Sequence, residues 1–152
     1  MQLKDVMTHN VEVAHVDTSV QEAAKLMKKL DVGSLPVGDG SQLIGMVTDR
    51  DITIRATAEG LDPKKTKVKD VMTSDLIYCF EDQAPVEAAV VMQEKQIRRL
   101  PIVNHAMKLV GIVSLGDLAV DSDQKDVDDD IIGEVLEDIS APAEPKRKAT
   151  IF

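Results

Sequence analysis

A pentapeptide that occurs twice without a single change is the strongest constraint on this fold. Lys4-Asp5-Val6-Met7-Thr8 recurs 65 positions later as residues 69–73. The same offset relates residues 22–24 to 87–89 and residues 35–36 to 100–101. After one inserted residue, residues 43–51 align with residues 109–117. Because matching segments run in the same order through both halves, the sequence indicates an internal duplication.

Each copy has the pattern of a β-α-β-β-α unit. In the first copy Thr18 or Ser19 can cap a helix whose apolar positions follow the 3.6-residue period. In the second copy Pro85 suits the first position of the equivalent helix. Short runs rich in β-branched residues follow at 35–37 and 43–47, and again at 100–103 and 109–113. A further helix is predicted from Asp49 to Gly60.

One copy of about 50 residues is small for a core of its own. We therefore expect an α/β fold in which two tandem β-α-β-β-α repeats pack sheet against sheet with pseudo-twofold symmetry and leave two related clefts. The predicted boundaries are 1–62 for the first repeat, 63–120 for the second and 121–152 for an acidic helix and tail. The tail helix is predicted from the apolar spacing of Ile132, Val135, Leu136 and Ile139.

Composition argues against several classes of partner. A net charge of −9 repels nucleic acid and anionic membrane surfaces, and only 2% of the residues are aromatic, which leaves few platforms for base stacking. No stretch approaches the ~20 apolar residues of a membrane helix. Cys79 is the only cysteine, so no internal disulfide can form and a reducing, cytoplasmic location is expected. We expect no contact with nucleic acid and no direct contact with a membrane.

The opening and closing motifs carry a family resemblance. Both copies open with Asp-Val-Met-Thr, and they close with Gly-Met-Val-Thr-Asp-Arg-Asp at 45–51 and Gly-Ile-Val-Ser-Leu-Gly-Asp at 111–117. In this order the motifs resemble a pair of CBS domains, the regulatory module named for cystathionine β-synthase. The resemblance covers about residues 3–120, and the segment 55–63 is similar to that of small stand-alone bacterial and archaeal proteins of this type.

The resemblance implies a regulatory module without catalytic activity. Its clefts would bind an adenosine ligand, which could be AMP, ADP, ATP or S-adenosylmethionine, and would relay occupancy to a partner. It also implies a homodimer formed through helices with spare apolar positions, such as Val91 and Met92 beside Val86, Ala89 and Val90. No cofactor other than the regulatory nucleotide is expected.

Site residues follow from the same resemblance, position by position. In the main cleft Asp117 would accept the ribose hydroxyls, Ser114 would lie near the ribose and phosphate, and Arg98 or Arg99 would bind phosphate. That cleft would be completed by Thr8, by Val11 or Val13 of the opening strand, and by Ser34. The second cleft would use Thr48, Asp51, Thr73 and Ile77. We expect it to be weaker, because Val32-Gly33 stands where the second copy has Ile97-Arg98 or Arg98-Arg99, although Arg50 or Arg55 could compensate.

Other interpretations of these residues remain open. Thr48-x-x-Asp51 and Ser114-x-x-Asp117 also have the spacing of a capping box, in which each carboxylate satisfies backbone donors at a helix start. The whole chain could instead be a structural or partner-docking module whose clefts bind nothing, and Cys79 could serve as a thiol sensor.

Catalytic and metal sites find little support. His9, His15 and His105 do not recur between the copies, and no nucleophilic set, P-loop or metal-ligand cluster is evident. The acidic run at 126–130 lacks the glycine and terminal glutamate spacing of a calcium loop. We therefore expect neither catalytic residues nor a metal site.

Overall fold

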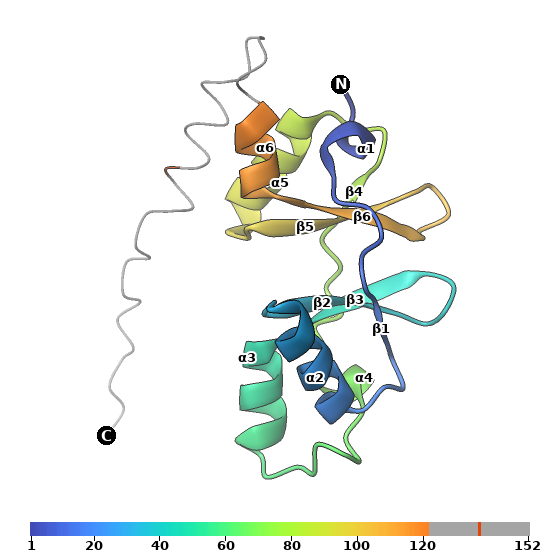
Figure 1. Ribbon diagram of the computed structural model, residues 1–152, viewed down its shortest axis with the longest axis vertical. Coiled ribbons are helices and arrows are strands. Elements are labelled where there is room, and N and C mark those ends of the chain that lie inside the picture. The colour runs from blue at the N-terminus through green and yellow to red at the C-terminus, as the bar shows by residue number, and fades with distance from the viewer. Residues whose placement is uncertain (122–136, 138–152) are drawn as a thin grey trace.

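The computed structural model describes residues 1–121 and 137 (Figure 1). The helix predicted around Ile132 to Ile139 lies outside the described residues, apart from Glu137. Within residues 1–121, two successive units each have the element order β-α-β-β-α, which confirms the sequence prediction.

The two units have matching elements. The first consists of β1 Ala14–His15, α2 Val20–Leu30, β2 Ser34–Gly38, β3 Leu43–Thr48, α3 Asp49–Ile52 and the π-helical turn η1 Thr53–Thr57. The second consists of β4 Cys79–Phe80, α5 Pro85–Lys95, β5 Arg99–Val103, β6 Leu109–Ser114 and α6 Leu115–Asp121. A short helix precedes each unit, α1 Leu3–Val6 before the first and α4 Val68–Val71 before the second.

Local signals set the helix ends. Ser19 rather than Thr18 caps α2, because its hydroxyl accepts a hydrogen bond from the Glu22 N–H at 3.2 Å. Pro85 is the first residue of α5, where its missing N–H costs nothing. Asp31 and Gln96 end α2 and α5 in the left-handed conformation, with φ of 54° and 53°. The equivalent ends of the two helices are therefore built in the same way.

Each unit contains a three-stranded sheet. The orders are β1-β2-β3 and β4-β5-β6, with the first pair parallel and the second antiparallel in both. The opening strands are two residues long, so β1 pairs only with Val37 and Gly38, and β4 only with Ile102 and Val103. On the side of the opening strand, the first half of each central strand, residues 34–36 of β2 and 99–101 of β5, therefore has no neighbouring strand.

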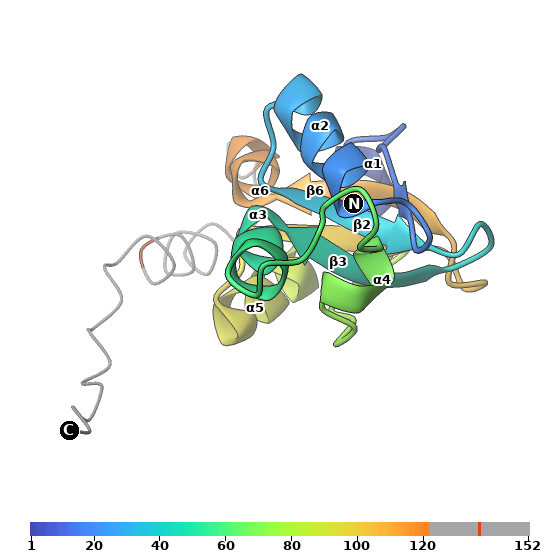
Figure 2. The ribbon, with the colours of Figure 1, turned by 90° about the horizontal axis from the view of Figure 1, so that it is seen from below.

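The two sheets face each other in the middle of the molecule, and helices lie on the outer side of each (Figure 1). The hairpin loops of both sheets lie at the same end, away from α3 and α6 (Figure 2). There the Leu43 N–H donates to the Met107 carbonyl at 2.9 Å. The central strands β2 and β5 are buried along most of their length, since one face meets a helix and the other meets the opposite sheet.

The short helices are exchanged between the units. Leu3 and Met7 belong to the core of the second unit, whereas Val68 and Val71 belong to the core of the first. Figure 1 shows α1 beside α5 and α6, and α4 at the opposite end of the molecule, which contains α2 and α3. The repeats found in the sequence are therefore not the units that pack together, because each core takes its first helix from the other repeat.

Equivalent backbone hydrogen bonds hold the two exchanged segments. Thr8 exchanges two of them with Ile112 of β6, at 2.8 and 3.0 Å, and Thr73 does the same with Met46 of β3, at 2.8 and 3.0 Å. Both crossings pass over a glycine. A Cβ atom on Gly45 would lie 2.6 Å from the Thr73 carbonyl oxygen, and one on Gly111 would lie 2.8 Å from that of Thr8. Only glycine allows the segments to approach so closely.

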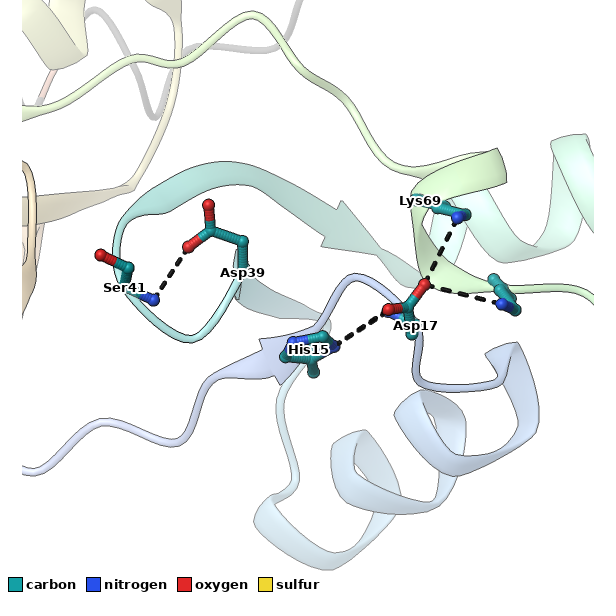
Figure 3. A network of polar contacts seen from close by, with 6 residues as sticks. His15, Asp17, Asp39, Ser41 and Lys69 are labelled. Atoms are coloured by element: carbon teal, nitrogen blue, oxygen red, sulfur yellow. Dashed lines mark hydrogen bonds and ion pairs between the residues drawn. The ribbon is translucent and has the colours of Figure 1, made fainter.

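Ion pairs add to the attachment of α4 (Figure 3). The Asp17 carboxylate lies 3.3 Å from the Lys69 Nζ and 3.6 Å from the Lys67 Nζ, and His15 lies on its other side. The hydrogen bond from Lys69 lowers the pKa of Asp17. These groups are exposed, so they orient the segment more than they stabilise it. The buried apolar contacts of Val68 and Val71 provide the main attachment.

The close crossings lead to a prediction for stability. Gly45→Ala and Gly111→Ala should each lower the free energy of unfolding by about 1–3 kcal/mol, because the added methyl group must push the exchanged segment away. Gly116→Ala is the matched control, since its Cβ would lie 3.6 Å from the nearest atom, the Ser114 Oγ. Urea unfolding followed by circular dichroism measures the differences. Equal stabilities of all three variants would contradict the role of the crossings.

Candidate functional site

A first cavity of about 360 Å³ opens beside the unpaired half of β2. The crossing segment of residues 8–12 forms one wall, and the end of β6 with the start of α6 forms the other. Its size falls within the usual range of small-molecule sites. The lining residues are Thr8, Asn10, Val11, Glu12, Leu30, Val32, Ser34, Leu35, Pro36, Arg99, Ile112, Ser114 and Asp117.

Most residues predicted for the main cleft meet in this cavity. The structure brings together Thr8, Val11, Ser34, Arg99, Ser114 and Asp117. Val13 is placed elsewhere, in a smaller cavity of about 190 Å³ near the hairpin loops. Neither Val11 nor Val13 belongs to the opening strand as predicted, because β1 begins only at Ala14.

A second cavity of about 610 Å³ lies beside the unpaired half of β5. It contains three residues predicted for the second cleft, Thr48, Thr73 and Ile77, together with the compensating Arg50. Its other lining residues are Gly33, Ser34, Met46, Asp49, Asp75, Ile97, Arg98, Arg99 and Pro101. The two cavities share Ser34 and Arg99, so they are neighbours.

The expected difference between the clefts needs correction. Arg98 was assigned to the main cleft but lines the second cavity, and Arg99 lines both. The second cavity thus contains both arginines, whereas the first contains only Arg99. The second cavity is therefore not short of basic groups. Arg55 takes no part in it, since its guanidinium donates to the carbonyls of Val71 and Met72 at 3.2 and 3.0 Å.

The two predicted ribose acceptors both cap helices. The Asp117 Oδ2 accepts a hydrogen bond from the Ser114 N–H at 2.8 Å, and the Ser114 hydroxyl accepts one from the Asp117 N–H at 3.2 Å. Asp51 and Thr48 form the same reciprocal pair at 3.0 Å each. Both spacings are thus capping boxes, as the alternative interpretation holds.

Asp51 and Asp117 differ in their access to the cavities. Asp117 lines the first cavity, and no hydrogen bond among the described residues reaches its Oδ1. Asp51 does not line the second cavity, because Thr73 lies between and directs its hydroxyl toward the carboxylate at 3.4 and 3.5 Å. Asp117 therefore has a free acceptor on the first cavity, whereas both carboxylate oxygens of Asp51 lie near the Thr73 hydroxyl.

Some lining residues were missed from the sequence. Ile112 and Met46 could have been found, since side chains alternate along a strand and these two share a face with Ser114 and Thr48. Asn10 and Glu12 gave no such signal, because they lie in an irregular segment whose path depends on the exchange of α1.

The sequence profile of the CBS domain matches residues 3–56 and 68–120. The chain belongs to the CBS domain family. The CBS domain-containing protein YhcV of Bacillus subtilis is 47% identical over 118 residues, which cover 78% of this chain and 83% of that protein. Hypoxic response protein 1 of Mycobacterium tuberculosis is 38% identical over 118 residues, covering 76% and 81%.

Solved structures of CBS proteins share the fold. Hypoxic Response Protein I with two coordinated zinc ions superposes with a TM-score of 0.72 at 35% identity, over 79% of this chain and 98% of that one. CBSX2 in complex with AMP gives 0.70 at 30% identity, over 81% and 96%. The CBS pair of MJ0100 with 5'-methylthioadenosine and S-adenosyl-L-methionine gives 0.67 at 29%, over 79% and 94%.

Residues 1–121 and Glu137 contain neither a metal-ligand cluster nor a membrane-spanning helix. In that part of the CBS pair, no group of three or more His, Cys, Asp or Glu side chains is placed to hold a metal ion. None of its helices is long and apolar enough to span a bilayer. His105 lies on the surface, where its Nε2 contacts the Asp82 carboxylate at 2.9 Å and its ring stacks on Phe80. The hydrogen bond to His105 lowers the pKa of Asp82.

Cys79 lies in the core of the second unit. Burial, with a smaller contribution from Glu87, raises the pKa of its thiol to about 11. Since the thiolate is the reactive form, this position disfavours the thiol-sensor hypothesis.

Burial of Cys79 leads to a second prediction. The native protein should not react with Ellman's reagent at mildly alkaline pH, whereas the protein in denaturant should release one equivalent of thiolate. As a control, Ser41→Cys in a Cys79→Ser background places a thiol on an exposed hairpin loop and should react at once. Rapid labelling of native Cys79, or a disulfide-linked dimer after mild oxidation, would restore the sensor hypothesis.

Proposed function

We propose that this CBS pair binds an adenosine nucleotide in its inter-repeat cavities and relays occupancy to a partner protein in the cytoplasm, without catalysing a reaction. The observation that carries the proposal is the meeting of Thr8, Ser34, Arg99, Ser114 and Asp117 around one cavity, although they come from both repeats. The adenosine ligands of CBSX2 and MJ0100 support the ligand class.

The chemistry of the first cavity suits a nucleoside. The free Oδ1 of Asp117 can accept hydrogen bonds from both hydroxyls of a ribose, since an ionised carboxylate oxygen has two lone pairs. Leu30, Val32 and Ile112 offer an apolar surface for a base. The polar and apolar parts of a nucleoside thus each have a counterpart in the lining.

The exchanged segment provides a route for the relay. Thr8, Asn10 and Glu12 line the first cavity and directly follow α1, whose Leu3 is buried in the second core. A ligand that orders residues 8–12 therefore acts on a segment that joins the two units. Such a ligand shifts the molecule toward the arrangement that binds it best.

The third prediction tests ligand binding and the role of Asp117. Calorimetry with AMP, ADP, ATP and S-adenosylmethionine should detect at least one ligand. Asp117→Asn should weaken the binding of the ligand that occupies the first cavity about tenfold, because one acceptor becomes a donor. The amide oxygen can still accept from the Ser114 N–H, so the helix cap is kept. The matched control is Asp5→Asn, because Asp5 also caps a helix, through the Gln2 N–H at 2.9 Å, and lines neither cavity.

Two outcomes would count against this function. If none of the four ligands binds, the chain is a structural or docking module. If Asp117→Asn and Asp5→Asn have equal effects on affinity, Asp117 acts only as a helix cap.

We also propose that the protein is a homodimer, and α5 offers the surface. Val90 is 39% exposed, and Val86 and Val91 are half-buried. Met92 was expected as a spare apolar position but, like Ala89, is fully buried in the core of the second unit. The pairing surface is therefore smaller than the sequence suggested, and Val90 is its most exposed residue.

The fourth prediction follows from this surface. Light scattering should give about twice the 16.6 kDa mass of one chain. Val90→Glu should shift the protein toward the monomer, because burying an unpaired carboxylate is costly. Leu61→Glu, at an apolar residue outside α5 that is slightly more exposed, should remain dimeric. A monomeric unmodified protein at micromolar concentration would contradict the dimer.

A further inference from the structure

Charged side chains are divided unequally between the two cavities. The first contains the carboxylates of Glu12 and Asp117 and a single cationic group, Arg99. The second contains three arginines, Arg50, Arg98 and Arg99, and two carboxylates, Asp49 and Asp75. At neutral pH the lining of the first cavity is negative in excess and that of the second is positive in excess.

Backbone hydrogen bonds engage one carboxylate in each cavity, and in the first it is Asp117, which accepts from the Ser114 N–H at 2.8 Å. In the second cavity the Asp49 Oδ1 accepts a hydrogen bond from the Arg50 N–H at 2.8 Å, which offsets part of its charge. Asp51, behind Thr73, is likewise engaged by the Thr48 N–H. In the first cavity Glu12 is exposed, and no hydrogen bond or ion pair among the described residues reaches its carboxylate. Its charge is not offset by a neighbouring cation.

Arg99 links the two cavities because it lines both. A guanidinium forms its strongest contact as a planar fork on one phosphate, so it cannot serve two phosphates equally. A phosphate in the second cavity would have Arg50 and Arg98 as well. A phosphate in the first would depend on Arg99 alone and would face two carboxylates.

We infer that the two cavities select adenosine ligands of different charge. The second cavity takes the phosphate-bearing ligand, and the first takes a neutral or cationic adenosine derivative. When Arg99 binds the phosphate in the second cavity, it is not available to an anionic ligand in the first. The module therefore binds two kinds of adenosine ligand, one in each cavity. This inference rests on the proposed function, and it reverses the order of phosphate affinity expected from the sequence.

The test is an amide NMR titration of the full chain with AMP and, separately, with adenosine. The amides of Val11 and Leu30 report on the first cavity, and those of Arg50 and Asp75 report on the second. AMP should shift the second set at a concentration at least about tenfold lower than the first set. Adenosine, without a phosphate, should not show this preference for the second cavity.

Single-site variants separate the two cavities. Arg98→Gln should weaken AMP binding in the second cavity about tenfold and change adenosine binding by less than about twofold. Glu12→Gln should strengthen AMP binding in the first cavity and leave the second unchanged. Lys28→Gln is the matched control for loss of a positive charge, since Lys28 is exposed on α2 and lines neither cavity.

The possible failures can be told apart. If AMP fills the first cavity first, or if Arg98→Gln and Lys28→Gln affect AMP equally, the charge selection is wrong although the clefts bind nucleotides. If neither AMP nor adenosine shifts any amide of either set, both the charge selection and nucleotide binding at these clefts are wrong.

Discussion

The passage of each opening segment over a glycine of the other repeat is the contact on which the rest of this structure depends. At Gly45 and Gly111 the backbone of one repeat lies directly against that of the other, and paired hydrogen bonds hold it there. This contact places α1 in the core of the second unit, where Leu3 is fully buried, and α4 in the core of the first, where Val68 is fully buried. It also directs residues 8–12 past the unpaired half of β2, where they form a wall of the first cavity. The same crossing therefore completes a core and builds a cavity wall.

The cavities owe their positions to the length of two strands. β1 begins only at Ala14 and β4 only at Cys79, so the first halves of β2 and β5 have no partner on one side. Pro36 and Pro101 lie there and have no N–H that would need one. A longer opening strand would pair with this edge and fill the space. The free edges therefore follow from the fold, while the charge of each cavity depends on a few side chains around it.

Much of this architecture could be predicted from the sequence, because duplication makes each signal appear twice. The five-element pattern follows from matched motifs, and the helix start at Pro85 follows from the local sequence. The grouping of Thr8 with Ser114 and Asp117 was implied by the resemblance to CBS pairs. The cavity that Arg98 lines could not be predicted, because Arg98 lies in the bend before β5, where no strand alternation sets its direction. The burial of Met92 and the path of Glu12 were missed for another reason. Both depend on α1 packing in the other unit, which local periodicity does not reveal.

The reciprocal exchange also bears on how such a chain could arise. The first helix of a single repeat does not pack in that repeat's own core, which therefore lacks a helix. Two identical copies could each supply the helix that the other core lacks. A symmetric pair of short chains is thus a self-sufficient ancestor. Joining them end to end makes an association between molecules internal, and it no longer depends on protein concentration. Fusion also freed the copies to diverge, and the positions of Gly33 and Ser34 now correspond to those of two arginines.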